Sequence, residues 1–190
     1  YGAMYAASFE TTIAAYSRFA MQHTWNAVLA TPVTLGELLC GEILWAASKA
    51  MLSAISVLAV GGLWGGINSW AGMLMALPIV FCASMAFAAC GLLATSFARG
   101  YEFFSYFFTF WITPMFVFCG VFFEIARFPD AVQWFAWLLP MTHLIAMIRP
   151  LTAGLEVDVI AMCGYLGYTW TLTVVAFWLT HRNLSRRMFD

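Results

Sequence analysis

Residues 70–97 read WAGMLMALPIVFCASMAFAACGLLATSF, an apolar run of 28 residues that contains no Asp, Glu, Lys or Arg. An α-helix needs about 20 apolar residues to cross the hydrocarbon core of a bilayer. This run is long enough, and Pro78 inside it predicts a kink. The whole chain has the same character, because 64% of its 190 residues are hydrophobic and only 9% are charged. The sequence therefore predicts an all-α, polytopic membrane protein and excludes a water-soluble enzyme.

Four further apolar segments flank this run and bring the prediction to about five spans of ~20 residues each. The first segment already begins inside an apolar helix at Tyr1, so we expect an upstream part of the domain to be missing from this sequence. All the spans belong to a single transmembrane domain over residues 1–190. The predicted spans are residues 1–19, 38–63, 70–97, 101–123 and 159–180.

A more polar stretch, residues 20–37, separates the first two spans. Within it, residues 24–30 fit a short amphipathic helix, since Trp25, Val28 and Leu29 recur at helical spacing. A proline and a glycine follow and end the pattern. We therefore expect a short surface helix between two spans.

The stretch before the last span, residues 124–158, contains two apolar pieces that are each too short to cross a bilayer. These pieces, residues 131–139 and 141–148, are separated by Pro140 and closed by Pro150. Short apolar segments bounded by proline are typical of re-entrant or interfacial helices.

Three polar residues in this stretch have two interpretations. Thr142 can cap the helix that starts after the first proline, and Arg149 suits the negative end of that helix's dipole. In that case both are architectural. Alternatively, Thr142, His143 and Arg149 form a gate or contact lipid headgroups.

The distribution of basic residues predicts the orientation. The ends near Arg18, Arg99 and the tail (residues 181–190) fall on one side of the membrane, and they carry five of the eight basic residues. The positive-inside rule makes that side cytoplasmic. The loop at residues 20–37 and the C-terminus are then cytoplasmic, and residues 124–158 are exoplasmic.

Several kinds of chemistry are not predicted for this chain. A formal net charge of −1 gives no basic field for nucleic acid. Lys49 is the only lysine, and no glycine pattern around it could form a phosphate-binding loop. The five cysteines form no CxxC pair, and no catalytic motif or metal-ligand spacing appears. The sequence predicts no catalytic residue, metal or cofactor of its own, so energy for transport would come from a partner or an ion gradient.

Two groups of residues inside the spans invite a functional interpretation. Glu10 and Lys49 are charged residues inside predicted spans, where an ionised side chain is energetically costly. They form either a proton or substrate relay or an interhelical ion pair. Lys49 could instead extend its charged end to the membrane surface. The span at residues 101–123 is unusually aromatic. It either packs against other helices and lipid or lines a translocation path, through Phe104, Phe107, Phe108 and Trp111.

Two stretches carry a resemblance to a known family. Residues 10–42 read ETTIAAYSRFAMQHTWNAVLATPVTLGELLCGE, and residues 139–151 read LPMTHLIAMIRPL. Both resemble ABC-2 type permeases, the membrane subunits of ATP-binding-cassette exporters, and within them the permeases of nodulation-factor exporters. The resemblance implies six spans per subunit, of which this sequence offers about five.

The family also implies partners and sites. It implies a homodimer in the bacterial cytoplasmic (inner) membrane, with two copies of a separate ATPase subunit that bind ATP and Mg. The cargo would be an amphipathic lipo-oligosaccharide, polysaccharide, glycolipid or drug. The first cytoplasmic loop would hold the coupling helix that docks on the ATPase, with the candidate residues Arg18, His23, Thr24, Trp25, Val28 and Leu29.

Two other functions stay open at this stage. One is an intramembrane lipid or sugar transferase, and the other is an ion-coupled secondary transporter. Copurification with an ATPase would separate the exporter from both.

Overall fold

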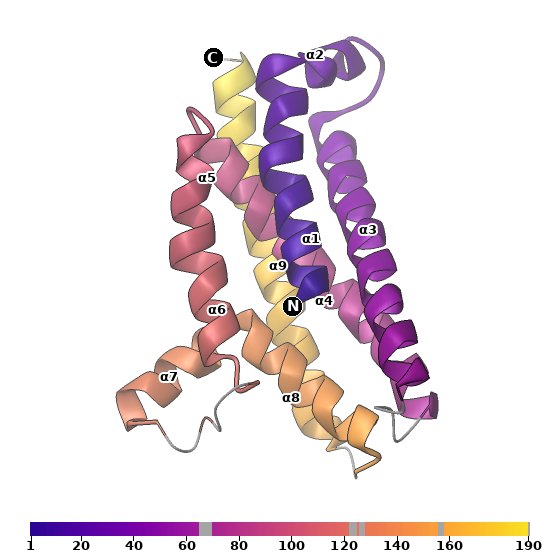
Figure 1. The fold of residues 1–190 in the computed structure, drawn as a ribbon. Coiled ribbons are helices and arrows are strands. Elements are labelled where there is room, and N and C mark those ends of the chain that lie inside the picture. Colours follow the sequence, from indigo (N-terminus) through magenta and orange to yellow (C-terminus); the bar gives the residue numbers. More distant parts are fainter. Residues whose placement is uncertain (65–69, 122–124, 126–127, 156–157, 190) are drawn as a thin grey trace.

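The structure is a computed structural model that describes residues 1–190 except 65–69, 122–124, 126–127, 156–157 and 190 (Figure 1). The described residues form helices joined by turns and contain no strand. Most of the helices run along one axis of an elongated bundle. The predicted all-α fold is confirmed.

The first helical stretch, residues 2–21, is interrupted by two π turns. It consists of α1 (Gly2–Phe9), η1 (Glu10–Ala14) and η2 (Ser17–Met21), with two α-helical residues between the π turns. At η1 it lies against α4 (Trp70–Phe97), where a Cβ on Gly91 would come 2.1 Å from Oγ1 of Thr11. Thr95 also donates a 2.7 Å hydrogen bond to the Thr11 carbonyl. The close approach of these two helices therefore depends on a glycine.

A short helix and a strong cap follow. Helix α2 (Thr24–Leu29) begins after His23, whose φ of 52° places it in the left-handed region. Helix α3 (Leu35–Leu63) starts with a capping box, in which Thr34 and Glu37 satisfy each other's backbone N–H groups. This cap explains why the second helix begins three residues before the predicted span.

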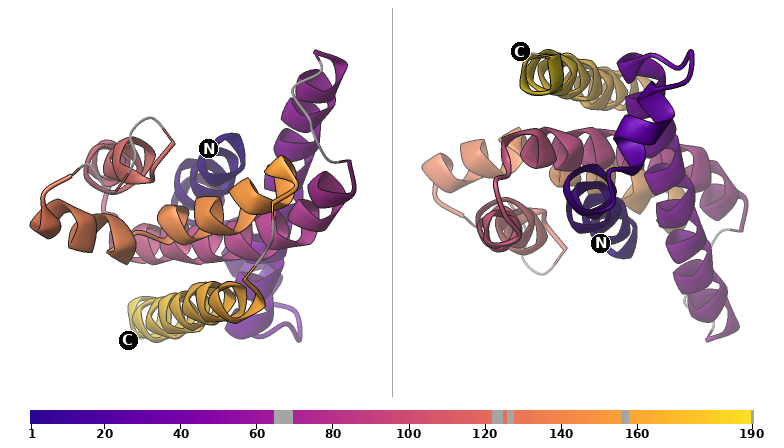
Figure 2. Two further views of the ribbon diagram at one scale, coloured as in Figure 1. Left: turned by 90° about the horizontal axis from the view of Figure 1, so that it is seen from below. Right: turned by 90° about the horizontal axis from the view of Figure 1, so that it is seen from above.

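Helix α4 lies in the middle of the bundle and is the most buried long helix. It packs against α1, α3, α8 (Pro140–Ala153) and α9 (Val159–Phe189). Figure 2 shows α9 on one side of α4 and α1 and α8 on the other. The uninterrupted apolar run at residues 70–97 thus forms the core element, with Pro78 inside the helix. The kink expected at Pro78 stays a prediction.

The aromatic segment forms one helical stretch over residues 102–118. It comprises α5 (Glu102–Phe107), η3 (Phe108–Ile112) and α6 (Thr113–Phe118). A π turn stands just before Pro114, and the Thr113 hydroxyl donates to the carbonyl of Phe108 at 3.1 Å. Proline lacks an N–H and crowds the preceding turn, so a local change of helix geometry is expected there.

The predicted pair of short helices is present. Helices α7 (Asp130–Leu138) and α8 meet at an angle of 86° (Figure 1). The prediction that Pro150 closes the second helix is wrong, because α8 runs past it to Ala153 and ends at Gly154, whose φ is 70°. Glycine adopts this left-handed conformation without steric cost, so it ends the helix more effectively than the proline.

Among the described residues, three helices are long and apolar enough to cross a membrane, namely α3, α4 and α9, and the α7–α8 pair would be a fourth if it crossed as one bent span. The helical stretches at residues 2–21 and 102–118 are the other predicted spans, and the count of about five stays a prediction. Helix α9 also continues through the basic segment that was expected to form a tail.

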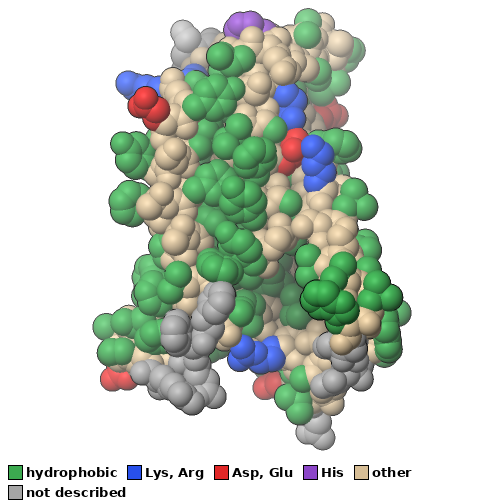
Figure 3. Space-filling model, viewed as in Figure 1, with side chains coloured by type: hydrophobic (Ala, Val, Ile, Leu, Met, Phe, Trp, Pro, Cys, Tyr) green, Lys and Arg blue, Asp and Glu red, His purple; other side chains and the backbone are tan. Residues whose placement is uncertain are grey.

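The two ends of the bundle differ. Helix α2, the turn at residues 98–100 and the C-terminus lie at one end, and α7 and α8 lie at the other (Figure 1). On the face in Figure 3, hydrophobic side chains cover the middle and most charged side chains lie toward the two ends. The arrangement agrees with a multi-pass membrane protein.

Candidate functional site

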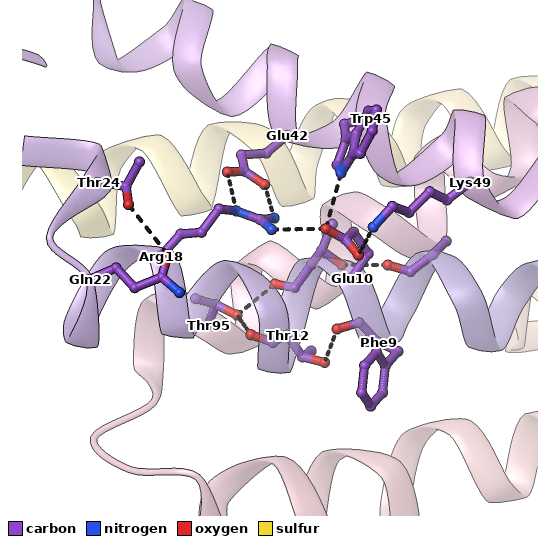
Figure 4. A network of polar contacts seen from close by, with 12 residues as sticks. Phe9, Glu10, Thr12, Arg18, Gln22, Thr24, Glu42, Trp45, Lys49 and Thr95 are labelled. Carbon is purple, nitrogen blue, oxygen red and sulfur yellow. Dashed lines mark hydrogen bonds and ion pairs between the residues drawn. The ribbon is translucent and has the colours of Figure 1, made fainter. Parts of the chain in front are cut away.

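A network of four charged side chains connects the first helical stretch to α3 below the loop helix α2 (Figure 4). Its first centre is the Glu10 carboxylate in η1. It accepts hydrogen bonds from Nη1 of Arg18 at 2.9 Å, Nζ of Lys49 at 2.7 Å and Nε1 of Trp45 at 3.1 Å. Glu10 therefore joins two cations that come from different helices.

The second centre is Glu42, near the start of α3. Its carboxylate receives two parallel hydrogen bonds from Arg18, at 3.0 Å from Nε and 2.5 Å from Nη2. It also accepts a 3.0 Å hydrogen bond from the indole Nε1 of Trp25 in α2. Arg18 thus bridges both carboxylates, and Glu42 connects α2 to the network.

The π turns explain how Glu10 and Arg18 reach each other along one helical stretch. Eight residues apart, they would point about 80° apart on a regular α-helix. Both residues lie in π turns, which place more residues in each turn and so rotate the chain less per residue. This change of register accounts for their meeting on one side.

The electrostatic balance of the network is zero, with two carboxylates and two cations. The carboxylate side chains are only 8% and 11% exposed, whereas Lys49 is 44% exposed. An isolated charge in a bilayer costs at least about 2.5 kcal/mol. Pairing and hydrogen bonding offset that cost. Glu10 and Lys49 form an interhelical ion pair in the structure, and a role of the two residues as a proton or substrate relay stays a prediction.

Two members of the network, Glu42 and Trp45, were not among the predicted site residues. The sequence does contain a signal for them, because Glu42, Trp45 and Lys49 are spaced by three and four residues. That spacing puts all three on one face of a helix. A carboxylate, an indole and a lysine on one face of an apolar span indicate a polar contact with a neighbouring helix.

The predicted coupling residues divide into an inner and an outer set. Trp25 is 1% exposed and packs against Phe19, with 5.2 Å between the ring centroids. Val28 and Leu29 pack against the core. His23 and Thr24 are exposed. The prediction that Trp25 fills a partner's groove therefore requires correction, because its side chain is buried within this chain. Val28 and Leu29 are partly exposed, and their contact with a partner stays a prediction.

The aromatic residues predicted to line a path lie in or against the cores of the bundle, and their role in a path stays a prediction. Phe104 is 1% exposed and lies edge-on to Tyr16, with 5.4 Å between the ring centroids. Phe107, Phe108 and Trp111 are partly buried against the core. The indole N–H of Trp111 is buried and has no hydrogen-bond partner among the described residues.

At the opposite end, the three predicted gate residues all lie on α8, but they have separate surroundings. The Thr142 hydroxyl donates to the carbonyl of Ala136 in α7 at 2.5 Å, so the prediction that it caps its own helix is wrong. Its bond lies across the 86° bend between the two helices.

Arg149 does not act at the end of its own helix either, because α8 continues past it. Its Nη2 donates to the carbonyl of Gly120 at 2.7 Å, just beyond the C-terminus of α6. It therefore satisfies a carbonyl of another helix. The side chain also borders two cavities, of about 470 and 220 Å³; the larger one is mainly apolar and lies between α1, α3, α4, α6 and α8.

His143 lies among aromatic rings. Its ring centroid is 4.4 Å from that of Tyr168 and 5.1 Å from that of Tyr165, with Trp137 at 5.7 Å. Both ring nitrogens are buried without a hydrogen-bond partner among the described residues. This environment disfavours a charged imidazole.

Comparison with known proteins assigns this membrane domain to a protein family. Residues 1–151 match the family described as ABC-2 type transporter, and the chain belongs to that family. It is a membrane component of a transporter, and its family implies an ABC ATPase partner.

Three individual relatives show which proteins of this family the chain is similar to. The chain is 35% identical over 193 residues to Nodulation protein J of Sinorhizobium fredii, covering 99% of this chain and 71% of that protein. It is 36% identical over 186 residues to Nodulation protein J of Rhizobium meliloti, covering 98% and 70% of the two chains. For the protein of that name from Rhizobium leguminosarum bv. viciae, identity is 37% over 186 residues, covering 98% and 71%. No solved structure matches the chain.

Proposed function

We propose that this chain is the permease subunit of an ATP-driven exporter in the bacterial cytoplasmic membrane. Two copies form a homodimer and bind two copies of the ATPase subunit, which hold ATP and Mg. An amphipathic substrate, such as a lipo-oligosaccharide, polysaccharide, glycolipid or drug, passes outward by alternating access. ATP-driven closure of the ATPases shifts the permease between its two states.

The single observation that carries this proposal is the attachment of α2 to both of its neighbouring helices. Trp25 binds Glu42 on α3, and Glu42 binds Arg18 at the end of the first helical stretch. A force applied to α2 would therefore act on two membrane helices together. That is the mechanical property that a coupling helix needs.

The docking contacts come from the exposed side of this loop. His23 and Thr24 are exposed, together with Asn26 in the first turn of α2. Trp25, Val28 and Leu29 hold the helix from the inside, and Arg18 transmits the displacement. We expect these outward residues to contact the ATPase directly at the cytoplasmic side, where the C-terminus also lies.

At the exoplasmic end, α7 and α8 form the gate. Arg149 links α8 to the end of α6 and borders both cavities, so a movement of α8 would change its bond to Gly120 and the shape of the larger cavity. Thr142 stabilises the bend between α7 and α8 through its bond to Ala136, and His143 packs among the aromatic rings beside it. The partly buried Phe107, Phe108 and Trp111, with Phe104 behind them, line the path in the open state.

A measurement of ATPase stimulation tests the proposal. The full-length permease is coexpressed with the ATPase, and Glu42→Gln is compared with Glu102→Gln, which changes an exposed acid at the same end but outside the network. Loss of stimulation in Glu42→Gln alone supports coupling through α2. Equal stimulation in both variants would contradict it. Failure of the wild-type permease to copurify with any ATPase would favour a transferase or an ion-coupled transporter.

A further inference from the structure

Three arginines line a depression between the ends of α4 and α9. The depression has a volume of about 360 Å³ and is formed by Ser96, Phe97, Arg99, Asn183, Arg186 and Arg187. It lies at the same end of the bundle as α2. None of these lining residues is acidic, and none belongs to the charge network of Glu10 and Glu42.

The depression is held in shape by hydrogen bonds. Arg187 donates from Nη1 to the carbonyls of Ser96 and Ala98, at 3.2 and 2.8 Å, and its guanidinium lies over the ring of Phe19. Asn183 donates to Oγ of Ser96 at 3.1 Å. These bonds join the last turns of α4 and α9, so the floor of the depression is fixed by both helices.

The remaining two cations have no counterion within the part of the chain that the structure describes. Arg99 and Arg186 are exposed and form no ion pair with any described residue. The nearest acid along the chain, Glu102, lines an adjoining depression that Arg99 also borders, yet it does not pair with Arg99. Two unpaired guanidinium groups beside a fixed floor favour an anion with several acceptor oxygens.

The surroundings favour a lipid over a protein partner. Both helices are long and apolar enough to cross a membrane, and the depression lies at their ends, where the polar headgroups of a bilayer would be. Its wall includes Phe97, which is 58% exposed, and the part of α9 that precedes these arginines carries the exposed Val175 and Leu179. A phosphate would meet the arginines while its acyl chains lie along this apolar surface.

We infer that the depression between α4 and α9 binds the phosphate headgroup of an anionic phospholipid through Arg99 and Arg186. This site is separate from the coupling network and from the gate, and it does not depend on the proposed transport function. Its occupant would hold the ends of the two helices together at the membrane surface. The other class of occupant, an acidic surface of a protein partner, is an outcome of the test.

Lipid retention on the purified protein tests this inference. The full-length permease, without ATPase, is titrated with phosphatidylglycerol and the bound lipid is counted by native mass spectrometry. Each basic residue at an anionic membrane surface contributes about fivefold to binding, so Arg99→Gln/Arg186→Gln should lose about 25-fold in affinity. The matched control is Arg182→Gln, which removes a charge from the same end of α9 but from a side chain that lies over Trp178 outside the depression.

Several results would overturn the inference. Unchanged phosphatidylglycerol affinity in the double variant would do so, as would equal retention of phosphatidylcholine by the wild type. Displacement of the lipid by millimolar inorganic phosphate would indicate a free-anion site. If the double variant keeps its lipid but no longer copurifies with the ATPase, the depression is a protein contact. If the double variant elutes as an aggregate, Arg99→Lys/Arg186→Lys replaces it. Retained phosphatidylglycerol binding in that variant supports a site that recognises its ligand by charge.

Discussion

Trp25 and Glu42 are joined by a 3.0 Å hydrogen bond from the indole Nε1 to the carboxylate, although they belong to different helices and lie 17 residues apart. The same carboxylate holds Arg18 by two bonds. The position of the loop helix is therefore set from inside the bundle, by the membrane helices that it connects.

Replacing this tryptophan tests the attachment. In Trp25→Asp, a second carboxylate would stand beside Glu42 and the ring packing on Phe19 would be lost, so ATPase stimulation should be abolished. Trp25→Phe keeps the ring but loses the N–H, which costs about 1.5–3 kcal/mol for a bond to a charged group. Stimulated ATP hydrolysis in the reconstituted complex should fall in the order wild type, Trp25→Phe, Trp25→Asp. Thr31→Asp is the control, because it adds the same charge at an exposed position of the same loop that is not among the proposed docking residues. Stimulation that survives in Trp25→Asp would refute the attachment.

The pair of Glu10 and Lys49 predicts a non-additive effect on stability. Glu10→Gln leaves two cations without a full counterion and should lower the melting temperature in detergent more than Lys49→Gln, whose side chain is 44% exposed. Lys49→Gln/Glu10→Gln restores part of the loss, because one charge of each sign is then absent. Fluorescence-detected size-exclusion chromatography after heating measures the order. Strictly additive losses would show that the two side chains do not interact.

Gly91 predicts a packing defect. Its Cβ in Gly91→Ala would lie 2.1 Å from Oγ1 of Thr11, so α4 and the π turn η1 would have to separate, at a cost of about 1–3 kcal/mol. Thr11→Ala in the same chain removes the clashing oxygen and should recover part of the stability. Gly41→Ala is the control, since a Cβ there would meet no atom of another element within 4 Å. Equal melting temperatures for the two single variants would contradict the close approach.

The hydroxyl of Thr142 bonds across the bend between α7 and α8. Thr142→Val removes the bond to the Ala136 carbonyl, which keeps the N–H of Leu139 as a donor, so we expect a loss of about 0.5–1.5 kcal/mol. Thr152→Val serves as the control, because Thr152 bonds only to carbonyls of its own helix. Limited proteolysis between the two helices should speed up in Thr142→Val alone, and unchanged cleavage would dismiss this role.

The proposed gate makes a separate prediction. Arg149→Ala loses the bond to the carbonyl of Gly120 and should reduce transport severalfold in proteoliposomes, while the complex with the ATPase still assembles. His143→Ala removes a ring from the aromatic cluster without breaking a hydrogen bond. We expect it to affect transport less than Arg149→Ala. Wild-type transport rates in both variants would mean that these residues are purely architectural.

Much of the fold was predictable because length and hydropathy are local properties. The limits of α4 agree with the apolar run, and the two short helices around Pro140 appear where proline predicts them. The end of α8 was not predictable from Pro150 alone, since helix termination there depends on the left-handed Gly154.

The candidate site was predicted only in part. Glu10 and Lys49 stood out because charges are rare in apolar helices, but their link through Arg18 depends on π turns that a regular helix pattern does not reveal. The side to which Trp25 points was also misjudged. An amphipathic helix at a surface can turn its apolar side toward a partner or toward its own chain, and only the packing with Phe19 and Glu42 decides between them.

The balance of charge under α2 has a consequence for membrane voltage. Moving one elementary charge across 100 mV takes about 2.3 kcal/mol. With both carboxylates ionised, Glu10, Arg18, Glu42 and Lys49 sum to zero, so displacing them together does no net work against the field. In the proposed exporter, movement of this network would therefore add no dependence on the membrane potential, and any such dependence would arise from other charges of the complex or from its cargo.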